Sequence, residues 1–219
     1  KRRLGFGGFL VTEYPPRIME KKLQSIWYRN EIKIADELME LAPKLRDEFL
    51  EYHKDFHTTF KGGISYAATN PLAILNEKEK NDWKVEGLRY SLPEQKIEQN
   101  FFLEPRIRKI FPTAAHLTQQ YIAHCGCSGY SVLEPKGEIK RHVDIENKSH
   151  RTIRIHIPLI VPQGDVYFEV CGKELEWSDI FGFDNGQLHG AQNNSEKRRL
   201  IYIIDITRDF LGIPQFGIG

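Results

Sequence analysis

Two histidines and one aspartate in the second half of the chain could together bind a metal ion. His142 and Asp144 are two positions apart in a segment that we predict to be a β-strand, so their side chains project to the same side. His189 follows 45 residues after Asp144, far enough for intervening hairpins to bring it back opposite the pair. Two imidazoles and one carboxylate on one face of a metal, with open positions left over, suit non-heme iron(II) oxygenases. We therefore predict that these three residues bind iron(II).

A competing motif lies in the first half of the chain. With 8 histidines and 30 acidic residues among 219, about one His-x-Asp/Glu triplet is expected by chance. His53-Lys54-Asp55 is a second such triplet, and His53 and His57 could share one helix face as zinc ligands do. The catalytic glutamate that follows the first histidine in such helices is missing, so we expect no metal site here.

Basic side chains accompany the first motif. The segment Ile153 to Ile157 alternates strictly, so Arg154 and His156 face one way, toward either solvent or a cavity. Arg199 begins an almost wholly apolar segment that should be buried, where a guanidinium needs an anionic partner. Its fork geometry suits the carboxylate of a dicarboxylic co-substrate or an internal Asp or Glu.

The elements that position these residues are predicted to be strands. After Gly126, short runs of β-branched and aromatic residues alternate with polar ones between turn residues. Gly164-Asp165, Cys171-Gly172 and Asp184-Asn185-Gly186 mark hairpin turns. Many short strands favour a sandwich or barrel, of which the double-sheet jelly roll is the economical form. The predicted strands are Gly129–Leu133, Ile139–Asp144, Thr152–Val161, Val166–Val170, Lys173–Trp177, Ile180–Asp184 and Arg199–Ile206.

The first half of the chain is predicted to be mostly helical. Apolar residues recur at helical spacing from Ile18 to about Phe56, with a break at Pro43, and again from Glu104 to about Ile122 despite Pro112. Between Thr58 and Phe102 turn residues dominate, which indicates loops around short elements. We thus expect one α+β domain over residues 1–219, with a mostly helical supporting segment (1–122) and a mainly β catalytic core (123–219).

Composition limits the class of protein. A formal charge of +1 provides no basic field for nucleic acid, and no apolar run approaches the roughly 18 to 20 residues of a membrane helix. No secretory signal pattern follows the basic, glycine-rich start. Cys125, Cys127 and Cys171 are too few for a disulfide framework and have no zinc-site spacing, so we expect plain thiols and a cytoplasmic setting. The classes of partner that remain are a small molecule and a protein.

Several of these residues jointly resemble the aspartyl/asparaginyl β-hydroxylase family of Fe(II)- and 2-oxoglutarate-dependent oxygenases. The resemblance runs from about Tyr130 to Asp205. Two spacings agree at once, because Ser131 lies eleven residues before His142 and Arg199 lies ten after His189. The segments that carry it are Ser131-Val132-Leu133-Glu134-Pro135-Lys136-Gly137, His142, Arg154-Ile155-His156, Phe183-Asp184, His189 and Arg199-Leu200-Ile201.

The resemblance implies a cupin-like double-stranded β-helix and three reactants: Fe(II), 2-oxoglutarate and O2. His142 and His189 would bind the iron. Arg199 with Ser131 would hold the distal carboxylate of 2-oxoglutarate, and Arg154 with His156 would contact its metal-bound end. The implied reaction is hydroxylation coupled to decarboxylation of 2-oxoglutarate to succinate.

Two positions depart from the family pattern. Mammalian-type members carry Gly where Asp144 stands, and related halogenases also lack the carboxylate, so Asp144 implies the full ligand set and argues against halogenation. Thr152 stands where peptide-modifying members have an Arg that contacts the acidic substrate, and the segment from Thr152 to His156 resembles bacterial hydroxylases of free amino acids such as proline. The implied substrate is an amino acid, either free or as an aspartyl/asparaginyl-type residue of a peptide.

Alternatives remain open at this point. The same scaffold could catalyse desaturation or demethylation, it could be a non-catalytic cupin-like binding protein, or it could be a zinc or manganese cupin. A structural role is favoured for each of five further residues that could contribute to substrate contact: Trp83, Arg89, Tyr90, Asn100 and Arg141.

Overall fold

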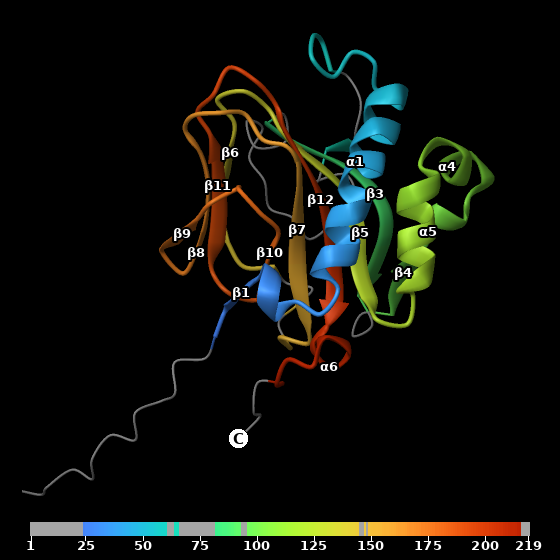
Figure 1. The fold of residues 1–219 in the computed structure, drawn as a ribbon, viewed down its shortest axis with the longest axis vertical. Helices are drawn as coiled ribbons and strands as arrows, with labels where there is room; N and C mark the ends of the chain where they lie inside the picture. Colours follow the sequence, from blue (N-terminus) through green and yellow to red (C-terminus); the bar gives the residue numbers. More distant parts are fainter. Residues whose placement is uncertain are drawn as a thin grey trace, which may run out of the picture.

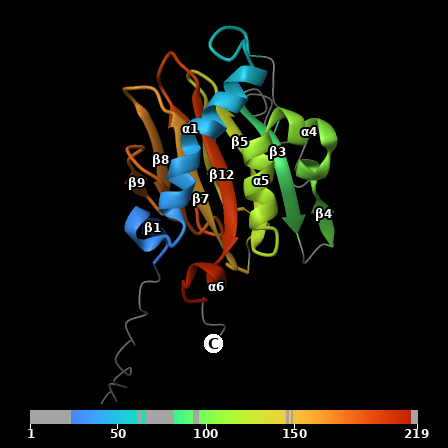
Figure 2. The same ribbon diagram turned by 45° about the vertical axis from the view of Figure 1, so that its right-hand side comes forward.

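Two antiparallel β-sheets lie face to face in this protein, with helices on the outer face of the larger sheet (Figure 1, Figure 2). The computed structural model describes residues 24–60, 64–65, 82–92, 96–144, 147 and 149–215. The larger sheet has the strand order β1-β10-β7-β12-β5-β3-β2, with β4 paired to β3, and the smaller sheet has the order β6-β11-β8-β9. This is the double-stranded β-helix core that the sequence predicted.

The bounds of the elements are as follows. The larger sheet contains β1 (Ile26–Tyr28), β2 (Ile64–Ser65), β3 (Trp83–Leu92), β4 (Ile97–Gln99), β5 (Cys125–Leu133), β7 (Thr152–Ile160), β10 (Phe181–Phe183) and β12 (Arg199–Thr207). The smaller sheet contains β6 (Glu138–His142), β8 (Val166–Val170), β9 (Lys173–Leu175) and β11 (His189–Asn193). The described helices are η1 (Arg29–Glu31), α1 (Ala35–Tyr52), η3 (Phe101–Leu103), α4 (Pro105–Ile110), α5 (Pro112–Gln120) and α6 (Arg208–Leu211).

The large sheet separates an apolar core from a polar interior. On β7 the three isoleucines Ile153, Ile155 and Ile157 point to the side covered by α1 and α5, whereas Arg154 and His156 line a pocket on the other side. Strand β12 follows the same rule, with alternate apolar residues in the helix-covered core. Because successive side chains of a strand point to opposite faces, both strands contribute to stability and to the site at once.

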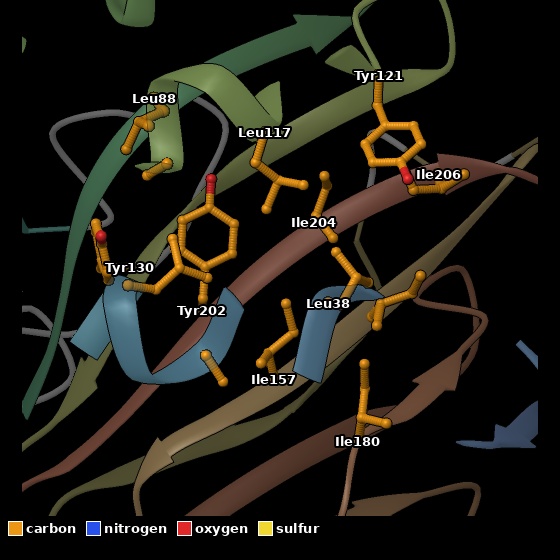
Figure 3. Close-up of a cluster of buried hydrophobic side chains, with 14 of the residues drawn as sticks. Leu38, Leu88, Leu117, Tyr121, Tyr130, Ile157, Ile180, Tyr202, Ile204 and Ile206 are labelled. Carbon is orange, nitrogen blue, oxygen red and sulfur yellow. The ribbon is translucent and has the colours of Figure 1, made fainter. Parts of the chain in front are cut away.

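The helix-covered core is continuous between α1, α5 and the large sheet. Figure 3 shows Leu38 of α1, Leu117 of α5 and Ile204 of β12 in this cluster, each with no exposed side-chain surface. Each such side chain contributes roughly 1.5 to 3 kcal/mol by leaving water. These contacts hold β7 and β12 rigidly in place behind the site.

The two prolines act in the opposite way to the sequence prediction. The predicted break at Pro43 is wrong, because α1 runs through it, and the predicted continuous helix across Pro112 is wrong, because α4 ends before it and α5 begins at it. Burial of α1 on the sheet outweighs one missing backbone hydrogen bond. Pro112 occupies the first turn of α5, where a proline costs nothing.

The mostly helical segment also contains strands. Residues 26–28, predicted to be helical, form β1 at the edge of the large sheet, and the start of that predicted helix, 18–23, lies outside the described residues. Within the predicted loop region, β3 is ten residues long and pairs with β5 from Trp83 to Arg89. The alternation of Trp83, Val85 and Gly87 on one face was hidden by the turn residues around it.

The hairpin predictions have a mixed outcome. Cys171-Gly172 does join β8 to β9, and the φ values of 51° and 78° are those of a type I′ turn. The turns at Gly164-Asp165 and at 184–186 are not hairpins, because each crosses from the large sheet to the small one. The strand β11, which carries His189, was not predicted at all.

Cys125 and Cys127 are free and buried, as predicted for this pair, and Cys171 is free and exposed. Among the described residues, no helix combines the length and the apolar character needed to cross a membrane.

Candidate metal centre

Strand pairing brings the two predicted histidine ligands together. His142 is the last residue of β6, His189 is the first of β11, and the two are partners in the antiparallel register. Their ring centroids are 4.3 Å apart. A separation of 47 positions in sequence is thus closed by one cross-strand pair.

Backbone carbonyls orient both rings in the same way. Nδ1 of His142 lies 2.7 Å from the carbonyl oxygen of Lys140, and Nδ1 of His189 lies 2.8 Å from that of Gln187. Since a carbonyl can only accept, each Nδ1 carries the proton and each Nε2 presents a lone pair. Such a carbonyl contact is the usual way in which proteins fix a metal-binding imidazole.

Asp144 supplies the carboxylate from just beyond the strand. The prediction that β6 extends to Asp144 is wrong, since the strand ends at His142 and the backbone N–H of Asp144 donates to the carbonyl of Asn185 at 2.9 Å. Asp144 Oδ1 nevertheless lies 3.3 Å from Nε2 of His142 and 4.0 Å from Nε2 of His189. The three side chains therefore converge as predicted, although a loop contact rather than strand geometry positions the carboxylate.

The second oxygen of Asp144 is fully engaged. Oδ2 accepts a hydrogen bond from Nδ2 of Asn185 at 2.9 Å and another from Nη1 of Arg154. The Asn185 amide is itself held by Nδ2 of Asn147 at 2.7 Å. With Oδ2 held in this way, Oδ1 is left to face the two imidazoles.

Arg154 lies between two buried carboxylates. Its Nε and Nη2 atoms donate to Oδ1 and Oδ2 of Asp205 at 2.7 and 2.8 Å, while Nη1 contacts Asp144. All three side chains are at most 4% exposed. A buried charge is stable only when paired, so Asp205 holds Arg154, which in turn orients Asp144.

The charges around the ligands follow from burial and these ion pairs. Burial favours the neutral form of Asp144, but Arg154 and the two histidines hold the pKa of its carboxyl well below the usual range. Burial lowers the pKa of His189 to about 4. An ionised carboxylate beside a neutral imidazole is the form in which both groups bind a metal.

The donor set fits one metal ion. The three ligand atoms lie within 4.8 Å of one another. Ligands about 2.1 Å from a metal that share one of its faces are roughly 3 Å apart, so a bound ion would draw the three side chains closer together. Nε2 of His142 is buried and makes no hydrogen bond within the described part of the chain. Two neutral imidazole nitrogens and one carboxylate oxygen suit a divalent first-row metal such as iron(II).

A pocket of about 350 Å³ opens beside the ligands, and we call it the metal pocket. Arg199 on β12 and Ser131 on β5 both line it, as do Arg154 and His156 of β7. Ser131 Oγ accepts a hydrogen bond from Nε1 of Trp83 at 3.0 Å. The side chains for which the resemblance implied contact with 2-oxoglutarate therefore share one cavity with the histidine ligands.

Arg199 is a buried cation with no acidic partner among the residues that the structure describes. It is 1% exposed, its Nε and Nη1 atoms make no hydrogen bond, and its guanidinium lies 4.9 Å from the ring of Trp177. Burial alone lowers the pKa of this guanidinium below its usual value. Such a site favours an anion that enters the pocket and accepts two hydrogen bonds.

His156 is neutral for a related reason. Burial, with the nearby cations Arg199 and Arg154, holds the pKa of its ring well below the ordinary value. The ring stacks on Trp177 at 5.8 Å, and Nδ1 has no hydrogen-bond partner among the described residues. Among the described residues, buried nitrogen atoms without hydrogen-bond partners thus lie on His156, Trp177 and Arg199 in or beside this pocket, where acceptor oxygens of a small acid would satisfy N–H donors. The lone pair on Nε2 of His142 would instead be satisfied by a metal ion.

The predicted substrate residues are not all in one place. Trp83 lines the metal pocket, while Arg89 and Tyr90 line a neighbouring cavity that we call the side pocket. Asn100 accepts a hydrogen bond from Arg89. Arg141 is 63% exposed and paired with Glu169 on the small sheet, away from both pockets.

The competing motif forms no metal site. His53 follows α1, is buried, and its Nε2 lies 3.2 Å from the carboxylate of Glu86. Of the histidine, cysteine and acidic side chains that the structure describes, one group of three converges as metal ligands would, and it is His142, Asp144 and His189.

Three residues of the site were missed by the sequence reasoning: Asn147, Asn185 and Asp205. Asp205 left a signal, because it is the one charged residue in the apolar run from Leu200 to Ile206. The two asparagines left none, since Asn is common in turns for local reasons.

Comparison with known proteins agrees with this arrangement. A family model described as aspartyl/asparaginyl beta-hydroxylase matches residues 29–209. Comparison with curated proteins gives no match.

Solved structures with similar folds include a prolyl hydroxylase from Trichoplax adhaerens in complex with a hypoxia inducible factor peptide fragment (10% identity, 78% of this chain, 80% of that chain, TM-score 0.44). They also include an oxidoreductase of the 2OG-Fe(II) oxygenase family from Burkholderia pseudomallei (10%, 57%, 66%, 0.41). A third is the Cnp3 cupin domain of Schizosaccharomyces pombe (14%, 67%, 80%, 0.35). Similarities at this level say nothing about substrate.

Proposed function

Since this chain belongs to the aspartyl/asparaginyl β-hydroxylase family, we propose that it hydroxylates an amino acid, free or within a peptide, at a centre formed by His142, Asp144 and His189. The protein is a 2-oxoglutarate-dependent hydroxylase. The proposed metal is iron(II), and the proposed co-substrates are 2-oxoglutarate and dioxygen.

One observation carries the proposal: the proposed histidine ligands share a pocket with the buried guanidinium of Arg199, which has no acidic partner among the described residues. A pure binding module has no reason to keep all three metal ligands together with Arg199, whose buried guanidinium costs stability while no anion is bound. A diacid that approaches the metal with one carboxylate could reach Arg199 with the other. This combination favours an oxygenase over a non-catalytic cupin-like protein.

The residues that line the metal pocket would have different roles in the reaction. Bound iron(II) would supply the redox chemistry by which one oxygen atom enters the substrate and the other enters succinate, with release of carbon dioxide. Arg199 and Ser131 would hold the distal carboxylate of 2-oxoglutarate. His156 would offer its neutral ring near the other end, and Phe168 and Phe183 would exclude water from the reacting atoms.

Arg154 has a more specific role in this proposal. Because Asp205 and Asp144 already engage its donors, it would act as a positioning residue that keeps Oδ1 of Asp144 directed at the metal. The direct contact of Arg154 with 2-oxoglutarate that the resemblance implied stays a prediction. The reducing, cytoplasmic setting expected from the cysteines also stays a prediction.

The experiment that tests the function is succinate formation. Protein stripped of metal is supplied with 2-oxoglutarate under air, with or without iron(II), and succinate is measured. We expect succinate only with iron(II), more of it when a substrate is added, and a product heavier by one oxygen atom. A product lighter by two hydrogens would indicate desaturation, and the absence of succinate under all conditions would refute the proposal.

A further inference from the structure

The side pocket adjoins the proposed metal centre on the inner face of the large sheet. Its empty volume is about 470 Å³, part of which is open to solvent, and its wall includes Val85, Gly87, Phe101, Cys127, Arg154 and Ile203. Arg154 and Ile203 also line the metal pocket, so the two cavities share a wall. Arg154 contacts Asp144 directly, which places the side pocket next to a proposed metal ligand.

The surface of the side pocket offers little to a charged side chain. Val85, Phe101 and Ile203 provide apolar surface, and Gly87 provides bare backbone. Ser128, a polar member of the wall, is engaged with Thr118 at 2.9 Å.

The cations at this pocket are already neutralised. Nη1 of Arg89 donates to Glu98 at 2.9 Å and Nε donates to the carbonyl of Cys125 at 2.9 Å. Arg154 is engaged by both Asp144 and Asp205. Two guanidinium groups thus face three carboxylates, so a carboxylate entering from a substrate would lose its hydration without gaining an unpaired cation.

Gly87 leaves space where another residue would fill it. A Cβ atom built on Gly87 would have no atom within 4 Å. Its cross-strand neighbour on β5 is also a glycine, Gly129, so no side chain from either position covers the floor of the pocket. The missing side chain of Gly87 leaves open space beside β3, whereas a Cβ atom on Gly129 would lie 2.5 Å from the carbonyl oxygen of Glu86, so Gly129 instead allows the two strands to approach closely.

We propose that the side pocket receives an uncharged aliphatic side chain or ring of the substrate, so that a C–H bond of this group, and not one of an aspartyl or asparaginyl side chain, is hydroxylated. This rests on the proposed function, which supplies the co-reactants. The step balances as substrate C–H, O2 and 2-oxoglutarate giving substrate C–OH, succinate and carbon dioxide.

The test combines binding with product analysis. The ligands are L-leucine, L-valine and L-proline against L-aspartate and L-asparagine, each supplied free and as the central residue of an otherwise identical capped tripeptide. Saturation-transfer NMR on the metal-free protein reports which side chains enter the pocket without any turnover. Mass spectrometry after incubation with iron(II), 2-oxoglutarate and air reports which ligand gains an oxygen atom.

Gly87→Leu fills the open space beside β3, and Gly87→Ala is its matched control, because it makes the same backbone change with a single methyl group. Each methylene kept from apolar surface weakens binding roughly fourfold, so we expect Gly87→Leu to weaken aliphatic ligands by about tenfold or more. Gly87→Ala should have a much smaller effect. The midpoint of thermal unfolding and cobalt(II) binding show that each variant is folded with its metal site intact.

We expect saturation transfer and oxygen gain with at least one aliphatic ligand, in the free or the peptide form, and loss of both in Gly87→Leu. Binding or oxidation of aspartate and asparagine alone, oxidation of none of the ligands, or aliphatic binding that Gly87→Leu leaves unchanged would overturn the inference. Succinate formation by the wild-type protein decides the proposed function separately. If no succinate forms, the proposed function fails, while the NMR measurement still decides what the side pocket holds.

Discussion

Replacing Arg199 with methionine should stabilise the ligand-free protein and abolish tight binding of 2-oxoglutarate. The buried guanidinium of Arg199 has two nitrogen atoms without hydrogen-bond partners and no acidic partner among the described residues. Methionine keeps much of the length and apolar surface but removes the charge and the donors. Arg208 is the matched control, because it is also buried but donates to Asp184 at 2.8 Å and to the carbonyl of His150 at 2.6 Å.

The magnitudes follow from these contacts. An unsatisfied buried donor costs about 1 to 3 kcal/mol, and water in the pocket recovers part of this for Arg199, so Arg199→Met should raise the free energy of unfolding by about 2 kcal/mol. Arg208→Met removes the buried cationic partner of Asp184, whose carboxylate keeps contacts with Asn147, His150 and the backbone N–H of Gly186, and should lower the free energy of unfolding by about 3 kcal/mol. Two charge-assisted hydrogen bonds to a carboxylate contribute about 3 kcal/mol or more, so Arg199→Met should raise the KM for 2-oxoglutarate at least about a hundredfold.

Urea unfolding of the metal-free proteins, followed by tryptophan fluorescence, measures the first two changes, and succinate formation at varied 2-oxoglutarate measures the third. Opposite signs of the stability change in the two variants are the diagnostic result. If Arg199→Met were as destabilising as Arg208→Met, the guanidinium would have an internal partner. An unchanged KM would show that another cation anchors the co-substrate.

Three further predictions concern the metal ligands. Asp144→Ala should abolish coupled hydroxylation and weaken iron(II) binding, measured by metal content after dialysis, whereas His53→Ala should leave metal content unchanged; full hydroxylation by Asp144→Ala would refute its role. Asp205→Asn leaves Arg154 with one carboxylate, so the free energy of unfolding should fall by about 3 kcal/mol and iron(II) affinity should fall with it; unchanged affinity would mean that Asp144 is positioned without Arg154. Burial lowers the pKa of His189 to about 4 against an unfolded value of about 6.5, so the unfolded chain binds the proton first as pH falls, and His189 alone should lower the free energy of unfolding of the metal-free protein by about 2 kcal/mol between pH 7 and pH 5; a His189→Gln variant with the same pH profile would contradict this assignment.

Strands with clear alternation could be predicted from the sequence. The segment from Ile153 to Ile157 predicted a strand with a polar and an apolar face, and β7 has this division. The apolar run after Arg199 predicted a buried strand, and β12 is its counterpart. In both cases the residues that decide the structure are neighbours in sequence, so a local pattern suffices.

The strand β11 could not be found in the same way. Its residues, His189-Gly190-Ala191-Gln192-Asn193, include no β-branched or aromatic residue. It is a strand because β6 and β8 flank it on both sides. Tertiary pairing of this kind overrides the weak local preference.

The residues that position Asp144 could not be predicted from local sequence patterns, for a similar reason. The carboxylate is positioned by Asn185, from a turn that joins the two sheets, and by Arg154, from the facing sheet. These contacts join positions 41 and 10 apart in the chain. The proposed ligands could be singled out from the sequence because their chemical types are distinctive, whereas an amide that orients such a ligand resembles any other turn residue.

The alternation along β7 and β12 has a consequence for how such an enzyme can change. Residues of one parity, such as Ile155 and Ile204, face the helices, while their immediate neighbours, such as Arg154 and Ile203, face the pockets. Substitutions at the pocket-facing positions can therefore change substrate preference without disturbing the hydrophobic core on the other side of the sheet. A shift of either strand by one residue would turn its core-facing side chains toward the pockets and its pocket-facing side chains toward the helices. Both the hydrophobic core and the site would then be lost, so insertions within these two strands should not be tolerated.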